Sequence, residues 1–230
     1  MVSMDKTQRT AQQAAPAADA TRQALVMAAL QLFGRQGFDG TSTREIAAAA
    51  KANIGSIAYH FGGKAGLRLA AADYIVETIQ KIAGQALVTP AGSSPATSAQ
   101  AEAQIEAAVE RMVSFMVARP EAGEIVQFML RELSTPTEAL DRIYGGVFEP
   151  VHKRLCQLWA SATGGTPESE VTRLSVFMCI GQVIYFRIAR PAVLRRMGWA
   201  DIGAAEAAKI AGLAKENVAA MIAARKAGKP

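Results

Sequence analysis

The chain has 230 residues, half of them apolar, and carries a formal net charge of +5 at pH 7. This length allows one or two domains with a substantial core. The two cysteines argue against a disulfide framework. The longest uncharged run, Leu174–Phe186, has thirteen residues and is too short for a membrane span. Strand signals are scarce beside Ala, Leu, Met and Glu, so we expect an all-α fold of about nine helices in a soluble, cytoplasmic protein.

The N-terminal residues 1–20 are rich in Ala, Gln and Thr and are expected to form a flexible extension. Basic side chains here could instead reach a DNA minor groove, although Asp5 and Asp19 offset two of the charges. The first helix is expected over residues 21–36, with Gly37 as its stop.

Residues 41–61, TSTREIAAAAKANIGSIAYHF, predict two short helices joined by a tight turn. Thr41 and Ser42 can cap the first helix, and Glu45 stands three residues beyond Ser42, as in a capping box. Asn53 is a good cap for the second helix.

A helical projection divides the second of these helices into two sides. The expected inward side carries Ile54, Ile57, Ala58 and Phe61. The outward side carries Gly55, Ser56, Tyr59 and His60, and it holds no carboxylate. Groups that can hydrogen-bond phosphates or base edges on such a side are typical of a helix-turn-helix whose second helix enters a major groove.

The charge distribution agrees with this interpretation. Residues 1–64 contain seven Lys or Arg against four Asp or Glu, hence +3, whereas the other 166 contain eighteen against sixteen, hence +2. Positive charge is therefore denser around the segment that would bind DNA, as counterion release requires. A net charge of +5 taken alone would equally fit mere solubility.

The next helix is expected to begin at Lys64, after Gly62 and Gly63, and to run to about residue 87. Because a lysine at a helix N-terminus opposes the helix dipole, Lys64 suits a phosphate partner; a solvated surface lysine is the alternative. The Pro-, Gly- and Ser-rich stretch over residues 88–99 predicts a loop.

The rest of the chain predicts helices at about 100–119, 121–134, 137–161, 167–190 and 204–224, with an interruption of the third at Gly145-Gly146 and Pro150. Bulky apolar residues with two polar companions are candidates for an effector pocket, and structural core is the alternative. The candidates are Phe115, Met116, Phe128, Met129, Phe148, His152, Trp159, Gln182 and Tyr185. Val176, Ile180 and Ile184 recur every fourth residue, which predicts a stripe buried against a partner subunit.

No catalytic, metal or cofactor site is expected. The sequence has no Cys, His or Asp cluster at metal-ligand spacing and no nucleophile motif with a histidine and an acid. Glu102, Glu106 and Glu110 are interpreted as a solvated face, and His152 as a core or pocket polar group.

Residues 22–67 resemble the DNA-binding domain of TetR-family transcriptional regulators. The matching features are Phe33, Gly37, Phe38, the run Thr43-Arg44-Glu45-Ile46-Ala47, Tyr59-His60-Phe61 and Lys64. Gly181–Trp199, with Arg131–Ser134 and Glu149-Pro150, resembles the C-terminal domain of CerR-like members of that family. Four arginines near the end of this segment suit a helix C-terminus, and contact with an anionic effector is the alternative. They are Arg187, Arg190, Arg195 and Arg196.

The resemblance implies a three-helix DNA-binding domain at 21–67, with the helix from residue 64 leading into an effector-binding and dimerisation domain at 68–230. It implies a homodimer, assembled through 167–190 and 204–224, that binds pseudo-palindromic double-stranded DNA and is a repressor released by a small apolar or amphipathic effector. The candidate DNA contacts are Thr43, Arg44, Asn53, Gly55, Ser56, Tyr59, His60 and Lys64.

Two departures from the family pattern leave an alternative open. Lys51 stands where the turn commonly has Gly, which costs on the order of 1 kcal/mol in a left-handed conformation. Ala58 stands where Tyr is common. The alternative is a helical small-molecule-binding protein with weak or no DNA binding, whereas an enzyme would lack any catalytic constellation.

Overall fold

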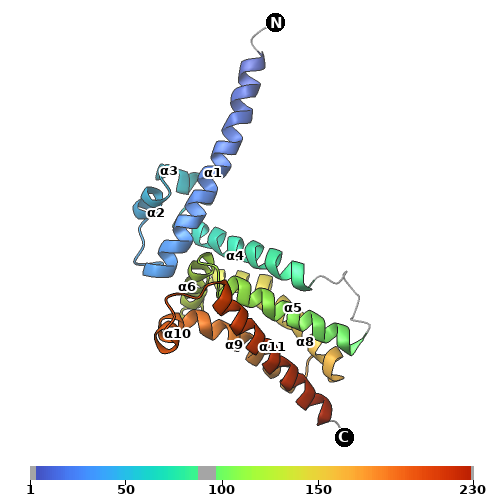
Figure 1. Cartoon of the computed structure of the whole chain (residues 1–230). Coiled ribbons are helices and arrows are strands. Elements are labelled where there is room, and N and C mark those ends of the chain that lie inside the picture. The colour runs from blue at the N-terminus through green and yellow to red at the C-terminus, as the bar shows by residue number, and fades with distance from the viewer. Residues whose placement is uncertain (1–3, 88–96, 229–230) are drawn as a thin grey trace. The chain divides into compact units, whose positions relative to one another are not determined.

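The computed structural model describes residues 4–87 and 97–228, and within these ranges it contains helices and no strand (Figure 1). The all-α prediction is confirmed. The helices are α1 (Met4–Gln36), α2 (Thr43–Ala49), α3 (Gly55–Phe61), α4 (Lys64–Leu87), α5 (Ser98–Met116), α6 (Glu121–Ser134), α7 (Glu138–Ile143), the π-helical turn η1 (Tyr144–Phe148), α8 (Glu149–Thr163), α9 (Glu170–Ile188), α10 (Arg190–Met197) and α11 (Ala204–Ala227).

The start of the first helix differs from its expected position. α1 begins at Met4 rather than near residue 21, because Ala, Gln, Met, Lys and Arg favour helix strongly enough to continue it toward the N-terminus. Its end is as predicted: Gly37 has φ +79° and donates its N–H to the Phe33 carbonyl at 2.9 Å. The loop expected at 88–99 falls largely on residues 88–96, which lie outside the described residues.

Two of the expected C-terminal helices are divided. The chain leaves α-helical geometry at η1, which contains Gly145-Gly146, and Pro150 stands in the first turn of α8. Gly146 allows a close approach to α4, because a Cβ there would lie 2.6 Å from a methyl carbon of Val76. The helix expected at 167–190 ends as α9 at Ile188, and α10 follows with Pro191 in its first turn.

The helices form two compact units. One unit comprises residues 1–75 and 127–142, and its buried side chains include Leu25 on α1, Ile46 on α2 and Ile57 on α3. The other unit comprises residues 76–126 and 143–230, where α5 packs against α8, α9 and α11. The first unit therefore recruits the C-terminal half of α6 and α7 to the N-terminal helices.

α9 alone among the described helices is long and apolar enough, by composition, to cross a membrane. Core helices of globular proteins meet the same criterion, and α9 packs on α8 and α5 within its unit. Several large apolar side chains of α9 are nevertheless exposed.

Candidate nucleic-acid interface

The first helix of the helix-turn-helix is fixed by the predicted capping box. The Ser42 N–H donates to the Glu45 carboxylate at 2.7 Å, and the Glu45 N–H donates to the Ser42 hydroxyl at 3.2 Å. Hydrogen bonding of the Glu45 carboxylate with the Ser42 side chain, and with the Ser42 backbone, holds the pKa of the Glu45 carboxyl below its ordinary value. Thr41 does not cap α2; its buried hydroxyl donates to the Gly37 carbonyl at 2.7 Å, because it stands beside the open end of α1.

The turn between α2 and α3 holds a lysine in a left-handed backbone conformation. Lys51 has φ +52°, the one positive φ of a non-glycine residue among the described residues. This confirms the conformation expected where related turns have glycine. Asn53 then ends the turn, since its side-chain oxygen accepts the Gly55 N–H at 2.8 Å.

α3 is anchored by fewer apolar residues than its sequence predicts. Ile57 is 1% exposed and Phe61 is half-buried beneath the Arg22 guanidinium, 5.5 Å from the ring centroid. Ile54, however, is 47% exposed, and Ala58 is also exposed. Their expected inward placement is wrong: Ile54 has helical dihedral angles (φ −58°, ψ −34°) and Ala58 lies within α3, but only Ile57 of the four is buried, so the inward side of α3 is narrower than the projection assumed.

All eight candidate DNA contacts lie on α2, the turn, α3 or the first turn of α4, and none is buried. Tyr59 is 83% exposed. Arg44, Asn53 and Gly55 are also exposed, and Thr43, Ser56, His60 and Lys64 are half-buried. The chain has no Asp or Glu from residue 46 to residue 72, so the turn, α3 and the first turn of α4 carry no charge that would repel phosphate, whereas on α2 the exposed Glu45 carboxylate is bonded to Ser42.

Lys64 is positioned by an aromatic ring that the sequence did not single out as its partner. Its ammonium lies 4.2 Å from the centroid of Phe38, and the Arg68 guanidinium lies 4.7 Å from the same centroid. Cation–π contacts of this kind orient a charged side chain without neutralising it. Lys64 is thus held at the start of α4 with its charge retained.

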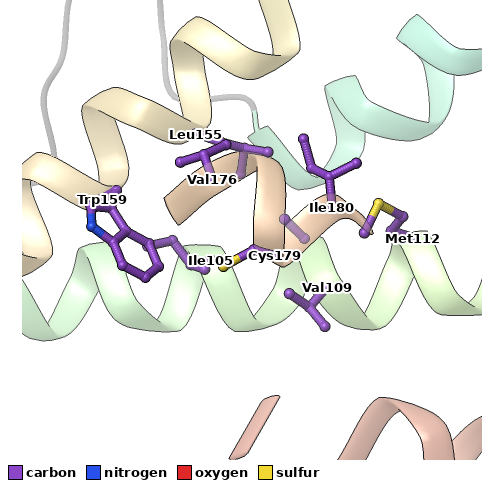
Figure 2. Close-up of a pocket in the computed structure, with 9 residues that line it drawn as sticks. Ile105, Val109, Met112, Leu155, Trp159, Val176, Cys179 and Ile180 are labelled. Atoms are coloured by element: carbon purple, nitrogen blue, oxygen red, sulfur yellow. The ribbon is translucent and has the colours of Figure 1, made fainter. Parts of the chain in front are cut away.

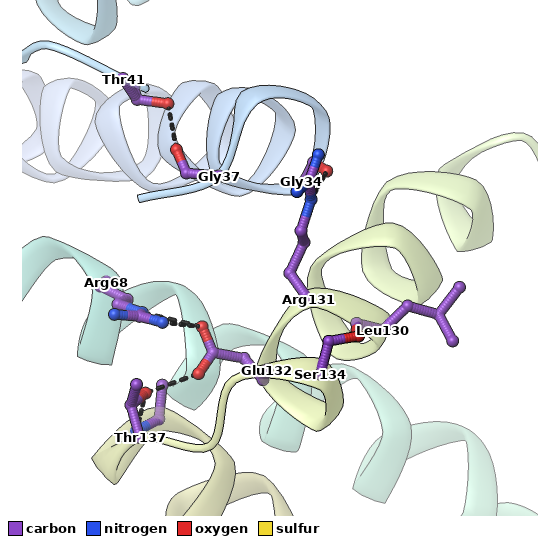
Figure 3. A network of polar contacts seen from close by, with 10 residues as sticks. Gly34, Gly37, Thr41, Arg68, Leu130, Arg131, Glu132, Ser134 and Thr137 are labelled. Atoms are coloured by element: carbon purple, nitrogen blue, oxygen red, sulfur yellow. Dashed lines mark hydrogen bonds and ion pairs between the residues drawn. The ribbon is translucent and has the colours of Figure 1, made fainter. Parts of the chain in front are cut away.

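A buried polar network inside this unit was also missed from the sequence (Figure 3). Glu132 is 2% exposed; it accepts from the Arg68 Nε and Nη2 at 2.7 Å and from the Thr137 hydroxyl at 2.6 Å. Arg131 donates to the Gly34 and Arg35 carbonyls at 3.4 and 3.0 Å. α6 is therefore bonded to the end of α1, against which α2 and α3 pack, and to the start of α4.

The residues predicted for an effector pocket are divided between the two units. Phe128 and Met129 are buried in the unit that contains the helix-turn-helix, whereas Phe115 and Met116 are buried in the other. Tyr185 is 60% exposed, and Phe148 and Gln182 are half-buried.

His152 makes three contacts, with residues of α8 and α9, and does not line the cavity between α5, α8 and α9. Its ring stacks on Phe177 with centroids 4.0 Å apart, Nε2 lies 3.2 Å from the Arg173 carbonyl, and Nδ1 lies 3.6 Å from the Cys156 sulfur. Because a carbonyl can only accept, Nε2 carries the proton in this arrangement, and Nδ1 accepts from the thiol. His152 is thus a satisfied polar group of the α8–α9 contact.

A small apolar cavity does occur between α5, α8 and α9 (Figure 2). Trp159 is the one predicted pocket residue that lines it. The full lining is Ile105, Ala108, Val109, Met112, Leu155, Trp159, Val176, Cys179 and Ile180. Its volume of about 40 Å³ suits a few small atoms, whereas ligand sites of proteins usually span about 300–1,000 Å³.

α9 turns a different face outward from the one predicted. Val176 is 2% exposed and lines the cavity with Ile180, so the stripe of Val176, Ile180 and Ile184 belongs to the protein's own core. A four-residue spacing in the sequence does not determine which of the two apolar stripes of a helix faces inward. The exposed apolar residues of α9 are Val171, Leu174, Phe177, Met178, Tyr185 and Ile188.

The two thiols lie in the interior, and two of the four clustered arginines, Arg187 and Arg190, bond backbone carbonyls, whereas Arg195 and Arg196 are exposed. Cys156 and Cys179 are free and buried, as predicted, and burial raises the pKa of each thiol to about 11. Arg187 donates to the Arg119 and Pro120 carbonyls at 3.0 and 2.9 Å, and Arg190 to the Val117 carbonyl at 3.0 Å. Cations at the end of α5 match the structural role favoured from the sequence.

A helix-turn-helix whose second helix has a carboxylate-free outward face, joined to a second helical unit, is typical of a DNA-binding transcriptional regulator. Residues 25–71 match the family described as bacterial regulatory proteins, tetR family. Residues 101–225 match the C-terminal domain of the HTH-type transcriptional dual regulator CecR. The HTH-type transcriptional dual regulator CecR of Shigella flexneri is 32% identical over 179 residues, which cover 76% of this chain and 79% of that protein.

The chain therefore belongs to the TetR family. Its C-terminal domain matches that of CecR, so the subgroup that was described above as CerR-like is the CecR subgroup. Solved structures share the fold. AibR in complex with isovaleryl coenzyme A and operator DNA has a TM-score of 0.61 at 18% identity, covering 84% of this chain and 96% of AibR. A TetR-like transcriptional regulator from Rhodococcus sp. RHA1 has a TM-score of 0.62 at 16% identity, covering 91% and 97%. The family consists of transcriptional regulators rather than enzymes.

Proposed function

We propose that this regulator binds a pseudo-palindromic operator as a homodimer, through the eight candidate residues of the helix-turn-helix. The observation that carries this proposal is the outward surface of α3. Tyr59 is 83% exposed there, and it lies within a run of 27 residues, 46–72, that contains no Asp or Glu. Each subunit supplies one recognition helix, so two-fold symmetry requires two half-sites about 34–36 Å apart.

The homodimer interface is assigned to α9 and α11. Exposed positions 171, 174, 178, 181, 185 and 188 of α9 alternate by three and four, which is the spacing of a helix seam, and all but Gly181 are large and apolar. Leu213 on α11 is 62% exposed. Apolar surface of this kind marks an interface, and burial in a partner subunit explains the composition of α9 better than a membrane does.

The second unit is assigned the role of effector sensor. The cavity between α5, α8 and α9 is lined by apolar groups, so the fitting effector is apolar or amphipathic. At about 40 Å³ the cavity must widen to admit it, and a ligand that prefers the widened state shifts the population toward that state. AibR, in its complex with isovaleryl coenzyme A and operator DNA, supplies a precedent for both partners in one fold.

The regulator is proposed to be cytoplasmic, associated with the nucleoid when it binds DNA, and to have neither enzymatic activity nor a cofactor. Repression relieved by the effector is the proposed mode. The Shigella flexneri relative is a transcriptional dual regulator, so a reporter assay should examine whether this protein also activates some promoters.

The test is a fluorescence-anisotropy titration of the DNA upstream of the protein's own gene. Replacing Tyr59 and His60 together by Ala is expected to weaken operator binding at least tenfold while helicity and dimerisation stay unchanged, because neither side chain is buried. Lys64→Ala is expected to weaken all duplexes alike and to lower the slope of log K against log salt by about one. Wild-type affinity of the double variant would refute the assigned orientation of α3.

A further inference from the structure

The recognition surface contains an apolar pair that the DNA-binding assignment leaves unexplained. Ile54 is 47% exposed and Ala58, one helical turn further on, is exposed as well. Gly55 lies beside them without a side chain, and Tyr59 projects next to Ala58. These two side chains contribute nothing to the buried side of α3, which Ile57 and Phe61 form, so folding of the unit does not account for them.

The chemistry of the major groove offers one apolar group. Every base pair presents hydrogen-bond donors or acceptors there, and thymine adds its C5-methyl group. An aliphatic side chain placed against an amino or carbonyl edge would remove water from that edge without replacing its hydrogen bonds, which is unfavourable. Against a thymine methyl the same side chain buries apolar surface on both partners.

We propose that Ile54 and Ala58 are specificity-determining residues that recognise thymine methyl groups in each half-site. The proposal rests on the DNA-binding function proposed above and adds the base that the helix selects. Ile54 stands at the N-cap of α3 and is 47% exposed, so its branched side chain is accessible to a base edge.

The surroundings favour duplex DNA over a protein as the occupant of this surface. Arg44 and Lys51 are exposed on neighbouring elements, Lys64 is held by Phe38 at the start of α4, and no carboxylate occurs over residues 46–72; the Glu45 carboxylate of α2 is bonded to Ser42. An apolar pair with cations around it matches the major groove, where a thymine methyl group lies between two phosphate backbones. A protein partner of the same shape would need its own acidic rim to fit.

The experiment uses the full-length protein and an operator obtained by selection from random duplexes. Each thymine of one half-site is replaced in turn by deoxyuridine, which removes the C5-methyl group and leaves every hydrogen-bonding group in place. At one or two positions we expect affinity to fall about fourfold per methyl lost. At the remaining thymines the replacement should have no effect.

Variants then assign each methyl to its side chain. In Ile54→Ala, the deoxyuridine replacement opposite Ile54 should no longer change operator affinity. In Ala58→Ser, the replacement at the second position should likewise leave affinity unchanged. Ile54→Val keeps two methyl groups and should retain most of the preference for thymine over deoxyuridine. Because both residues are exposed, the variants should keep wild-type melting temperatures.

The possible failures are distinguishable. If selection yields an operator but no deoxyuridine replacement changes affinity, thymine recognition is refuted and DNA binding stands. The same holds if the wild-type sensitivity persists unchanged in Ile54→Ala and Ala58→Ser. If selection yields no duplex bound more tightly than random DNA, the proposed function itself fails.

Discussion

Arg68 and Glu132 form an ion pair at 2.7 Å within the DNA-binding unit, although they stand on α4 and α6, 64 positions apart in the sequence. The Glu132 side chain is 2% exposed and that of Arg68 is 17% exposed. Thr137 satisfies the second carboxylate oxygen, so the buried charge is fully bonded. The recognition helices thus depend on a helix that lies well beyond the N-terminal family motif.

Removing Arg68 is therefore expected to destabilise the unit severely. Arg68→Ala leaves the Glu132 carboxylate buried without its charge partner, which costs about 3–5 kcal/mol in the free energy of unfolding. Urea unfolding followed by circular dichroism measures the change. The Arg68→Met, Glu132→Leu double variant should recover most of the loss, because it removes the buried charge altogether.

Arg142→Ala is the matched control for that prediction. Arg142 pairs with Asp73 at 2.8 Å in the same unit, but the two side chains are 40% and 48% exposed. A pair this open to solvent is expected to contribute less than about 1 kcal/mol. Equal destabilisation by Arg68→Ala and Arg142→Ala would contradict the role given to the buried network.

Lys51 provides a test of backbone strain in the turn. Lys51→Gly and Lys51→Ala remove the same charge, yet only glycine adopts φ +52° without cost. We expect the Gly variant to exceed the Ala variant by about 1 kcal/mol in unfolding free energy. Differential scanning fluorimetry compares the two directly, and equal melting temperatures would show that the turn carries no such strain.

Local signals in the sequence predicted local structure well. The Ser42–Glu45 capping box, the Gly37 stop and the left-handed Lys51 depend on neighbouring residues alone, and each has its expected geometry. The projection failed at Ile54 and Ala58 although both have helical geometry, because a projection does not say how wide the buried side of a short helix is, and in α3 only Ile57 of the four residues expected to face inward is buried.

Contacts between distant segments could not be predicted in the same way. Periodicity on α9 shows two apolar stripes, and only the packing of α5 and α8 against α9 decides that Val176 and Ile180 face inward. The pocket candidates were chosen by residue type, and type does not say that Phe128 packs in one unit while Trp159 packs in the other.

Gly181 offers a clean test of the dimer interface. A Cβ built at Gly181 meets no atom within 4 Å in the subunit, so Gly181→Glu should leave the monomer fold intact. It would place a charge in the middle of the exposed apolar face of α9, and we expect monomers by light scattering at micromolar concentration. Gln157→Glu, an equal charge change at an exposed α8 position, should remain dimeric.

The two buried thiols predict a pH dependence of stability. Burial raises the pKa of Cys156 and Cys179 to about 11 from an ordinary value of 9.0. The unfolded chain therefore loses these protons first, so their contribution to stability is complete below pH 9 and is lost as pH rises toward 11. At pH 8 Ellman's reagent should label neither thiol in the native protein and both in urea; rapid native labelling would contradict this.

The cavity between α5, α8 and α9 leads to the last prediction. A screen of apolar and amphipathic compounds should yield hits that raise the melting temperature, and those hits should weaken operator binding. A tenfold loss of affinity needs a difference of about 1.4 kcal/mol between the two states, and near-complete release needs about 5.5 kcal/mol, or 10⁴-fold.

Ala108→Leu fills the cavity from α5, so it should abolish both effects of a hit while preserving operator binding. Ala103→Leu, at an exposed position of the same helix, should respond as the wild type does. Hits that act equally on Ala108→Leu would place the effector elsewhere, and hits that stabilise the protein without changing operator affinity would remove the sensor function, because a ligand with equal affinity for both states shifts neither.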